Sequence, residues 1–506
     1  MLKQITLSQD SSFWNRRLWL SLAAVGAAAA LTVAFSIGLI DGRMLLLLLA
    51  SFTFLLVVSV KYGALGIVVL LVGFPEMQIP FIPFDVPMLL PIILFIFGIE
   101  TLYRGRWNTA KTGGLFVIFV ATMAISWLWA ESAGLLSQSQ LNAYSTTNIH
   151  LSKIRVVWQI GAWVLGFGIF LYTVNHIKTL ADIYVLAKYL MIIGLIVSAY
   201  SYYEIVALEI GLPYSFPSIH DIDFVPNSKI SYSDSLFPRV YGSFHEPKLL
   251  GRFLLIPLFL SASAWSVLNT RRYLFYSVFI LGALTLTFSS TAFLGVVVGF
   301  FAWVYLLQQP GRRQVWRITA VAAVTISILA VVSGLFIDNF FAAAVAFVTL
   351  HPARVVGLIG NPTLVSGDYV NGWILGWKLF TISPIFGVGI GNSPFYSVST
   401  DNVVTPFNLL LLLLGEIGIL GLAAFLGLIG TILFRTFRAI RLPHTIADHP
   451  LATALIAGAI ASFIGGVFTY LAFGGARFYL EDWVLLGMMA RFAQLISRTS
   501  ASGEDN

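Results

Sequence analysis

The chain has 506 residues, of which 58% are hydrophobic and 10% are charged. A soluble globular protein carries about 25% charged residues, so most of this protein's surface is expected to face lipid. The formal net charge of +7 does not indicate nucleic-acid binding, because Lys and Arg gather in short links between apolar segments. The absence of cysteine excludes disulfides, thiolate metal sites and a cysteine nucleophile.

Long apolar segments follow one another along the chain, and a helix needs about 20 such residues to span a bilayer. We therefore expect an all-α integral membrane protein in which residues 1–506 form a single polytopic domain of about fourteen transmembrane helices. The candidate spans are 18–40, 44–60, 62–75, 86–102, 112–130, 155–175, 181–203, 247–268, 273–288, 291–308, 316–337, 405–434, 451–473 and 482–497.

The basic residues predict how these helices are oriented. Links rich in Lys and Arg lie on the cytoplasmic side of a membrane. With both termini cytoplasmic, nearly every compact basic cluster falls on that side. The clusters are Lys61; Arg104, Arg106 and Lys111; Lys178; Arg271 and Arg272; Arg312, Arg313 and Arg317; Arg435, Arg438 and Arg441; and Arg498.

The same orientation places two long loops on the periplasmic side, at about 204–246 and 338–404. Loops longer than about 12–15 residues are uncommon in compact proteins unless they are functional or disordered. These loops are rich in aromatic residues, Pro and Gly, which favours ordered structure. The second contains an amphipathic segment at 373–380 whose two Trp are expected at the level of the lipid headgroups.

The first loop ends in a dense group of cations. Residues 239–248 read Arg-Val-Tyr-Gly-Ser-Phe-His-Glu-Pro-Lys, and Arg252 follows in the next helix. Arg239, Lys248 and Arg252 are candidate ligands of an anion, because a guanidinium presents a planar fork of donors to phosphate oxygens. The alternative is that Arg239, Lys248 and Arg252 meet lipid headgroups.

His245 and Glu246 form a His–carboxylate pair on an exported loop and are candidates for proton transfer. Glu246 also precedes Pro247, so it has the alternative role of capping the following helix.

The second loop carries Arg354, a further candidate for binding an anionic substrate, and then a glycine-rich stretch at 387–394. A lone G-x-G-x-G without a flanking strand is a weak signal for phosphate binding. The stretch favours an irregular turn in which glycine allows close backbone approach.

Three stretches together resemble the O-antigen ligase and O-antigen polymerase superfamily of bacterial envelope glycosyltransferases. They are residues 239–247; residues 285–295 with their Ser-rich turn; and residues 373–392, followed by Pro-Phe-Asn at 406–408 and Gly-Glu-Ile-Gly-Ile-Leu-Gly at 415–421. The order and spacing of these motifs carry the resemblance.

The resemblance implies a C-type glycosyltransferase-like bundle that takes its glycan from polyprenyl (undecaprenyl) diphosphate at the periplasmic face, without metal or other cofactor. Arg239, His245 and Glu246 would be catalytic, and Arg239, Lys248, Arg252 and Arg354 would bind the diphosphate. The expected partners are the lipid-linked glycan and membrane lipids, with chain-length regulator and flippase proteins, and no nucleic acid.

The chain departs from the ligase pattern at position 407, where Phe replaces the usual His, and at position 291, where Thr stands for an arginine. The missing His removes the usual candidate base of ligases. We therefore expect repeat-unit polymerisation in O-antigen or exopolysaccharide biosynthesis, with ligation to lipid A core or another acceptor as the alternative.

Three other interpretations stay open. Asp221 and Asp223 form a D-x-D pattern that could hold a divalent cation. A polysaccharide or lipid transporter is the alternative of another class, although transporters tend to place ionisable residues at mid-membrane in two related halves. The third is a non-catalytic scaffold of an envelope complex.

Overall fold

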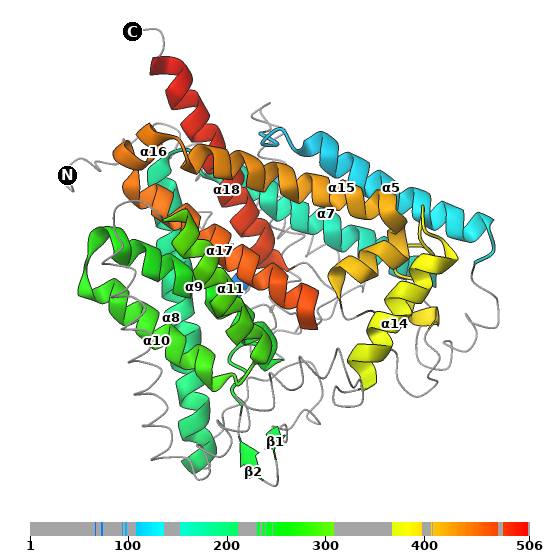
Figure 1. Ribbon diagram of the computed structural model, residues 1–506, viewed down its shortest axis with the longest axis horizontal. Coiled ribbons are helices and arrows are strands. Elements are labelled where there is room, and N and C mark those ends of the chain that lie inside the picture. The colour runs from blue at the N-terminus through cyan, green and yellow to red at the C-terminus, as the bar shows by residue number, and fades with distance from the viewer. Residues whose placement is uncertain are drawn as a thin grey trace, which may run out of the picture.

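Helices dominate the part of the chain that the computed structural model describes (Figure 1). That part comprises residues 108–135, 152–210, 230–232, 235–237, 239–244, 246–307, 367–396, 406, 408–473 and 479–503, with isolated positions at 66, 72–73, 94 and 97–98. The helices are α5 (Gly113–Ser132), α7 (Ser152–His176), α8 (Leu180–Ile210), α9 (Pro247–Leu268), α10 (Arg271–Leu286), α11 (Ser290–Leu306), α14 (Gly367–Ile382), α15 (Leu409–Ile440), α16 (Pro443–Asp448), α17 (Pro450–Phe473) and α18 (Leu480–Gly503).

The predicted spans within the described residues are all helical. Helix α9 begins and ends at the predicted residues, and α5, α7, α10, α11, α15, α17 and α18 differ from prediction only near their ends. Five described helices are long and apolar enough to cross a membrane: α5, α9, α15, Leu180–Ala207 of α8 and Pro450–Val467 of α17. The spans 18–40, 44–60 and 316–337 lie outside the described residues, as does most of 62–75 and 86–102. The number of fourteen therefore stays a prediction.

Local chemistry explains where several helices begin and end. Helix α9 starts with Pro247, whose missing N–H is not needed at the first helical position. Asn269 ends α9 in the left-handed conformation typical of helix C-termini. Asn408 caps α15, because its Oδ1 accepts hydrogen bonds from Leu410 and Leu411.

The first predicted loop differs from expectation at its start and at residues 230–237. Helix α8 continues to Ile210, so Glu204 lies inside a helix and not at the start of a loop. Ile230–Tyr232 (β1) and Ser235–Phe237 (β2) form an antiparallel hairpin, with Ser231 opposite Leu236. The all-α class holds for the bundle, and this hairpin is an exception to it that hydropathy did not predict.

The helices pack as two groups that meet along α18 (Figure 1). Helix α9 contacts α10, α11 and α17, and α11 also contacts α17, while α15 contacts α5, α14 and α18. Helix α18 also contacts α7 and α17. Helix α8 lies against α9 and α10, and so it borders the first loop.

The predicted basic links that are described lie at one end of the bundle, which we call the basic end. Arg435 of α15 donates from Nη1 to the carbonyl oxygen of Ala110, just before α5 (3.1 Å). Arg441 donates to the hydroxyl of Tyr305, near the end of α11. The end of α8 and the starts of α9, α11 and α18 form the other end, which we call the mixed-charge end. Which side of a membrane each end faces stays a prediction.

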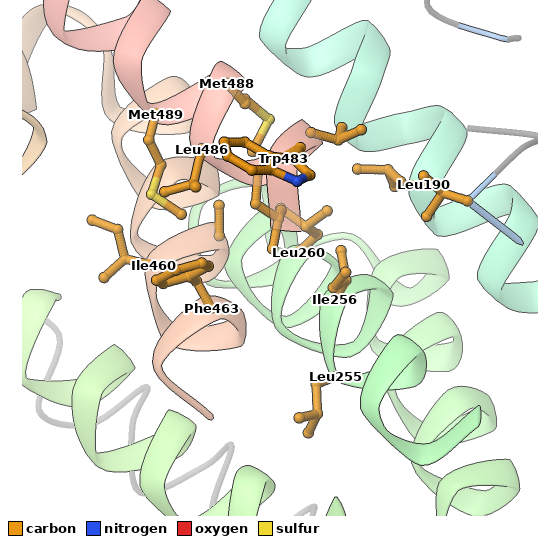
Figure 2. Close-up of a cluster of buried hydrophobic side chains, with 14 of the residues drawn as sticks. Leu190, Leu255, Ile256, Leu260, Ile460, Phe463, Trp483, Leu486, Met488 and Met489 are labelled. Carbon is orange, nitrogen blue, oxygen red and sulfur yellow. The ribbon is translucent and has the colours of Figure 1, made fainter. Parts of the chain in front are cut away.

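Trp483 of α18 lies at the centre of the core (Figure 2). It is almost completely buried among aliphatic side chains such as Leu260 and Leu486. The rings of Trp163, Phe167 and Phe116 meet it nearly edge-on, with interplanar angles of 88°, 81° and 84°. Such edge-on packing places the positive rim of one ring against the negative face of another. Trp483 thereby joins α18 to α7 and α5.

Glycines let the helices approach one another closely, as in many membrane bundles. A Cβ on Gly465 of α17 would overlap with the backbone carbonyl oxygen of Gly295 in α11. A Cβ on Gly458 would lie 2.7 Å from the carbonyl oxygen of Phe259 in α9. Because backbone atoms cannot move aside as a flexible side chain can, these contacts determine how closely α17 packs against α9 and α11.

We predict that Gly465→Ala lowers the thermal stability of the purified protein, because one added methyl group forces α11 and α17 apart. Overpacking of this kind costs about 1–3 kcal/mol. The measurement is thermal unfolding in detergent, followed by tryptophan fluorescence. Gly430→Ala is the matched control, because a Cβ at Gly430 of α15 meets nothing within 4 Å. Equal melting temperatures for the two variants would contradict the prediction.

Candidate functional site

The segment 239–244 lies against the bundle at the mixed-charge end. The amide of Val240 donates to the carbonyl oxygen of Leu286 at the end of α10 (3.3 Å). The Nε of Arg239 donates to the carbonyl oxygen of the next residue, Thr287 (3.0 Å). On the other side, the hydroxyl of Ser243 donates to the carbonyl oxygen of Gly73 (2.7 Å). The predicted Arg239 motif is therefore ordered, and its arginine is anchored on the turn between α10 and α11.

Glu204 of α8 holds the middle of this segment. Its carboxylate Oε2 accepts hydrogen bonds from the amides of Tyr241 (3.0 Å) and Gly242 (2.7 Å). The side chain is buried, with 8% of its surface exposed. Sequence reasoning placed Glu204 only at a loop boundary and did not name it as a site residue. The available signal was a carboxylate that directly follows an apolar span, where ionisable residues are expensive and often functional.

The turn between α10 and α11 is strained. Phe288 has a φ of +43°, a conformation that a residue with a bulky side chain rarely adopts. Ser289 stabilises the turn, since its Oγ accepts a hydrogen bond from the amide of Ala292 (3.3 Å) and bonds to the hydroxyl of Thr291 (2.7 Å). Backbone strain of this kind often occurs at functional sites, and here it lies beside the carbonyl group that binds Arg239.

The start of α9 brings the predicted charges close to this turn. Gly251 packs against Thr287, Ser289 and Ala292, so α9 touches the strained turn directly. Lys248 forms an ion pair with Glu246 (2.7 Å), and both side chains are partly exposed. An accessible lysine ammonium can bind an anion, and the carboxylate beside it can accept a proton. The alternative role of Glu246 is to cap α9, but its side chain accepts no capping hydrogen bond from the backbone amides at the start of that helix.

Arg252 lies deeper in the bundle than the other cations, with 5% of its surface exposed. Its guanidinium forms ion pairs with Glu481 (3.4 Å) and Asp482 at the start of α18. It also lies over the ring of Tyr479, 4.6 Å from the ring centre. Two carboxylates thus compensate the charge of Arg252. This geometry favours a cross-link between α9 and α18 over the predicted contact with a diphosphate.

The glycine-rich stretch packs against a break in α15 and forms hydrogen bonds with it. We call this contact the joint. Gly418 interrupts the helix with a φ of +68° and a ψ of −172°. Because the break exposes carbonyl groups, Gly415 and Glu416 accept hydrogen bonds from the amides of Val388 and Gly389, each at 3.0 Å. Gly387 comes so close to Glu416 that a Cβ would overlap with its backbone. The expectation that glycine here serves close backbone approach is confirmed.

The carboxylate of Glu416 occupies the donors that a phosphate would need. It accepts hydrogen bonds from the amides of Gly391 (2.8 Å) and Ser393 (3.1 Å). Ser393 begins the short 3₁₀ helix η4 (Ser393–Tyr396). The hydroxyl of Ser126 in α5 donates to the carbonyl oxygen of Glu416 (2.5 Å). This stretch therefore binds a carboxylate of the chain itself, and its role in the described structure is to fix α14 against α15.

The structure brings four of the predicted site residues to the mixed-charge end: Arg239, Glu246, Lys248 and Arg252. His245 and Arg354 lie outside the described residues, as does Phe407. Among the described residues, no group of three or more His, Asp or Glu side chains could hold a metal ion. The D-x-D pattern at 221–223 also lies outside the described residues.

Residues 275–426 match the family model described as O-antigen ligase. The matched segment covers less than a third of the chain and runs from the first turn of α10 into α15. It includes the strained turn, α14, and the joint between the glycine-rich stretch and α15. No curated protein matches the chain. The match confirms the resemblance to the O-antigen ligase and polymerase superfamily that the motifs predicted.

We predict that Arg252→Met destabilises the protein, because two buried carboxylates lose their cation. Breaking a buried ion pair from one side costs about 3–5 kcal/mol. Adding Glu481→Gln and Asp482→Asn to Arg252→Met is expected to restore most of the loss in thermal unfolding. If Arg252→Met alone melted like the wild type, the role of Arg252 as a cross-link would be wrong.

Proposed function

We propose that the protein is a membrane glycosyltransferase that polymerises oligosaccharide repeat units carried on polyprenyl diphosphate, in O-antigen or exopolysaccharide biosynthesis. The observation that carries the proposal is the match of residues 275–426 to the O-antigen ligase family, a segment that borders the mixed-charge end. The match supports a function of the ligase or polymerase type in general. A chain with at least five helices able to span a membrane suits a substrate that lies in lipid.

In the proposed reaction, a hydroxyl oxygen of the acceptor repeat unit attacks the anomeric carbon of the donor glycan. A glycosidic carbon–oxygen bond forms, and the bond between the anomeric carbon and the diphosphate oxygen breaks. The electron pair leaves with polyprenyl diphosphate, and the hydroxyl proton passes to a base. The departing diphosphate gains negative charge, so cations that face it stabilise the transition state.

Arg239 and Lys248 are the proposed ligands of the diphosphate among the described residues, with Arg354 as a third from the second loop. The bond to Thr287 fixes the Arg239 guanidinium beside the turn between α10 and α11. Glu246 or His245 is the proposed base. Lys248 pairs with Glu246, and this pair joins the proposed diphosphate site to the proposed base. Arg252 is proposed to act only by fixing the start of α9 beside this pair.

Helix α14 is proposed to lie along the membrane surface and to cover the site. Its Leu375 and Leu379 are buried against the glycine-rich stretch, whereas Ile374 and Trp377 are exposed. An exposed Trp beside an aliphatic residue suits the boundary between headgroups and acyl chains.

The mixed-charge end is proposed to face the periplasm of a bacterial inner membrane, because the basic end suits the cytoplasmic side. Chain-length regulator and flippase proteins are the proposed partners there.

Ligation is the second candidate function, because the description of the matching family model is O-antigen ligase. Phe407 stands where ligases usually have His, and this departure favours polymerisation. The two functions differ only in the acceptor that delivers the attacking hydroxyl.

The proposed function is tested with purified protein in detergent that contains EDTA. The substrate is a repeat unit linked to polyprenyl diphosphate, and the products are separated on a gel. A ladder of lengthening glycans is expected from a polymerase that needs no metal. Transfer only after addition of a lipid A core acceptor would establish the ligase. No product in either reaction, beside an active homologue as control, would overturn the proposed function.

We predict that Arg239→Ala abolishes the glycan ladder while the protein stays folded, because the leaving diphosphate loses its anchored cation. Loss of one such electrostatic contact typically lowers the rate about 10²–10³-fold. Arg438→Ala is the matched control, since Arg438 is an exposed arginine near the basic end of α15. Full activity of Arg239→Ala would show that Arg239 is not part of the site.

A further inference from the structure

We infer that Glu204 is a positioning residue, which sets the direction of Arg239 by holding the backbone of the segment 239–244. The inference rests on the proposed function for its catalytic consequence. Whether Glu204 holds Arg239 in place does not depend on the reaction that the protein catalyses.

Two anchors hold the segment from opposite sides. On one side, Arg239 and Val240 bind the carbonyl groups of Thr287 and Leu286 after α10. On the other side, Glu204 of α8 binds the amides of Tyr241 and Gly242. The anchors act on consecutive pairs of residues, so the chain direction between them has little freedom. Releasing either anchor would let the Arg239 side chain leave its place beside the turn.

Glu204 is suited to this role because both amides converge on a single oxygen, Oε2, at 3.0 and 2.7 Å. Hydrogen bonds from amides to a carboxylate are stronger than those between neutral groups. A buried carboxylate without such partners would be costly near a membrane-spanning segment. The two hydrogen bonds therefore offset the cost of burying the carboxylate, and they also order the segment 239–244.

Glu204 accepts the amides of Tyr241 and Gly242, and the residues that follow them have contacts of their own. Ser243 is anchored by its hydroxyl at Gly73, and Phe244 donates its amide back to Tyr241 (3.1 Å). The position of Tyr241 thus affects the residues that lead to Glu246 and α9 as well. A displaced Tyr241 would disturb the proposed diphosphate ligand on one side and the proposed base on the other.

The test compares Glu204→Ala, which removes both hydrogen bonds, with Glu204→Gln, whose amide oxygen can still accept them. Glu131→Ala is the matched control, because Glu131 is an exposed carboxylate at the end of α5. Three measurements are made on full-length protein in detergent. They are hydrogen exchange of the amides of Tyr241 and Gly242, the rate at which phenylglyoxal modifies Arg239, and the steady-state kinetics of glycan transfer.

In Glu204→Ala, we expect faster exchange at Tyr241 and Gly242 and a changed rate of Arg239 modification, with Arg438 modified as in the wild type. We expect kcat to fall at least about tenfold with a change in KM below about threefold, because a cation that meets charge developing in the transition state affects kcat most. Glu204→Gln should recover the wild-type labelling rate and most of kcat. The Glu131→Ala control should leave all three measurements unchanged.

The outcomes separate positioning from a merely structural role. An Arg239 labelling rate that is the same in Glu204→Ala and the wild type would overturn the inference, whatever happens to activity. Equal losses in Glu204→Ala and Glu204→Gln, with faster exchange across the whole bundle, would overturn it too. A wild-type protein that transfers no glycan would overturn the proposed function, and Arg239 labelling would still decide whether Glu204 positions Arg239.

Discussion

The hydrocarbon core of a bilayer cannot donate or accept hydrogen bonds, so leaving a polar group there without a protein partner is costly. The described part of the chain meets this constraint three times in a similar way. Glu204 receives two backbone amides, Glu416 receives two more, and Arg252 receives two carboxylates. Each cluster joins segments that are far apart in the sequence. The charged groups that are costly to bury are therefore also the ones that fix the loops at the mixed-charge end.

The break in α15 shows how an irregular backbone becomes stable in such a bundle. Gly418 interrupts the helix, and amides of the glycine-rich stretch donate to the carbonyl groups of Gly415 and Glu416 that the interruption frees. The reverse also occurs, because Ile419 donates its amide to the carbonyl oxygen of Pro384 (2.9 Å). Broken helices at membrane depth are tolerated where neighbouring protein satisfies the freed groups. The joint holds the end of α14 and the short helix η4 beside α5 and α15, at the mixed-charge end of the bundle.

The proposed chemistry uses cations at two levels of burial. Arg239 and Lys248 are partly exposed at the mixed-charge end and are the proposed ligands of the diphosphate. Arg252 lies in the interior with its charge compensated, and it joins α9 to α18. The sequence shows these three cations within fourteen residues and offers no reason to separate them. Burial and ion pairing assign them different roles, because a guanidinium between two carboxylates has little charge left for a substrate.

The membrane class and most of the described helices follow from local hydropathy, which can be read along the chain without knowledge of the fold. The bounds of α9 and the use of glycine at 387–391 follow from the same local chemistry. Only the tertiary structure decided that α8 carries Glu204 beyond the predicted span, that Glu204 meets Tyr241, and that Glu416 meets Gly391. It also paired Arg252 with Glu481 and Asp482. These contacts join residues far apart in the chain, and no short pattern encodes which helix ends meet in space.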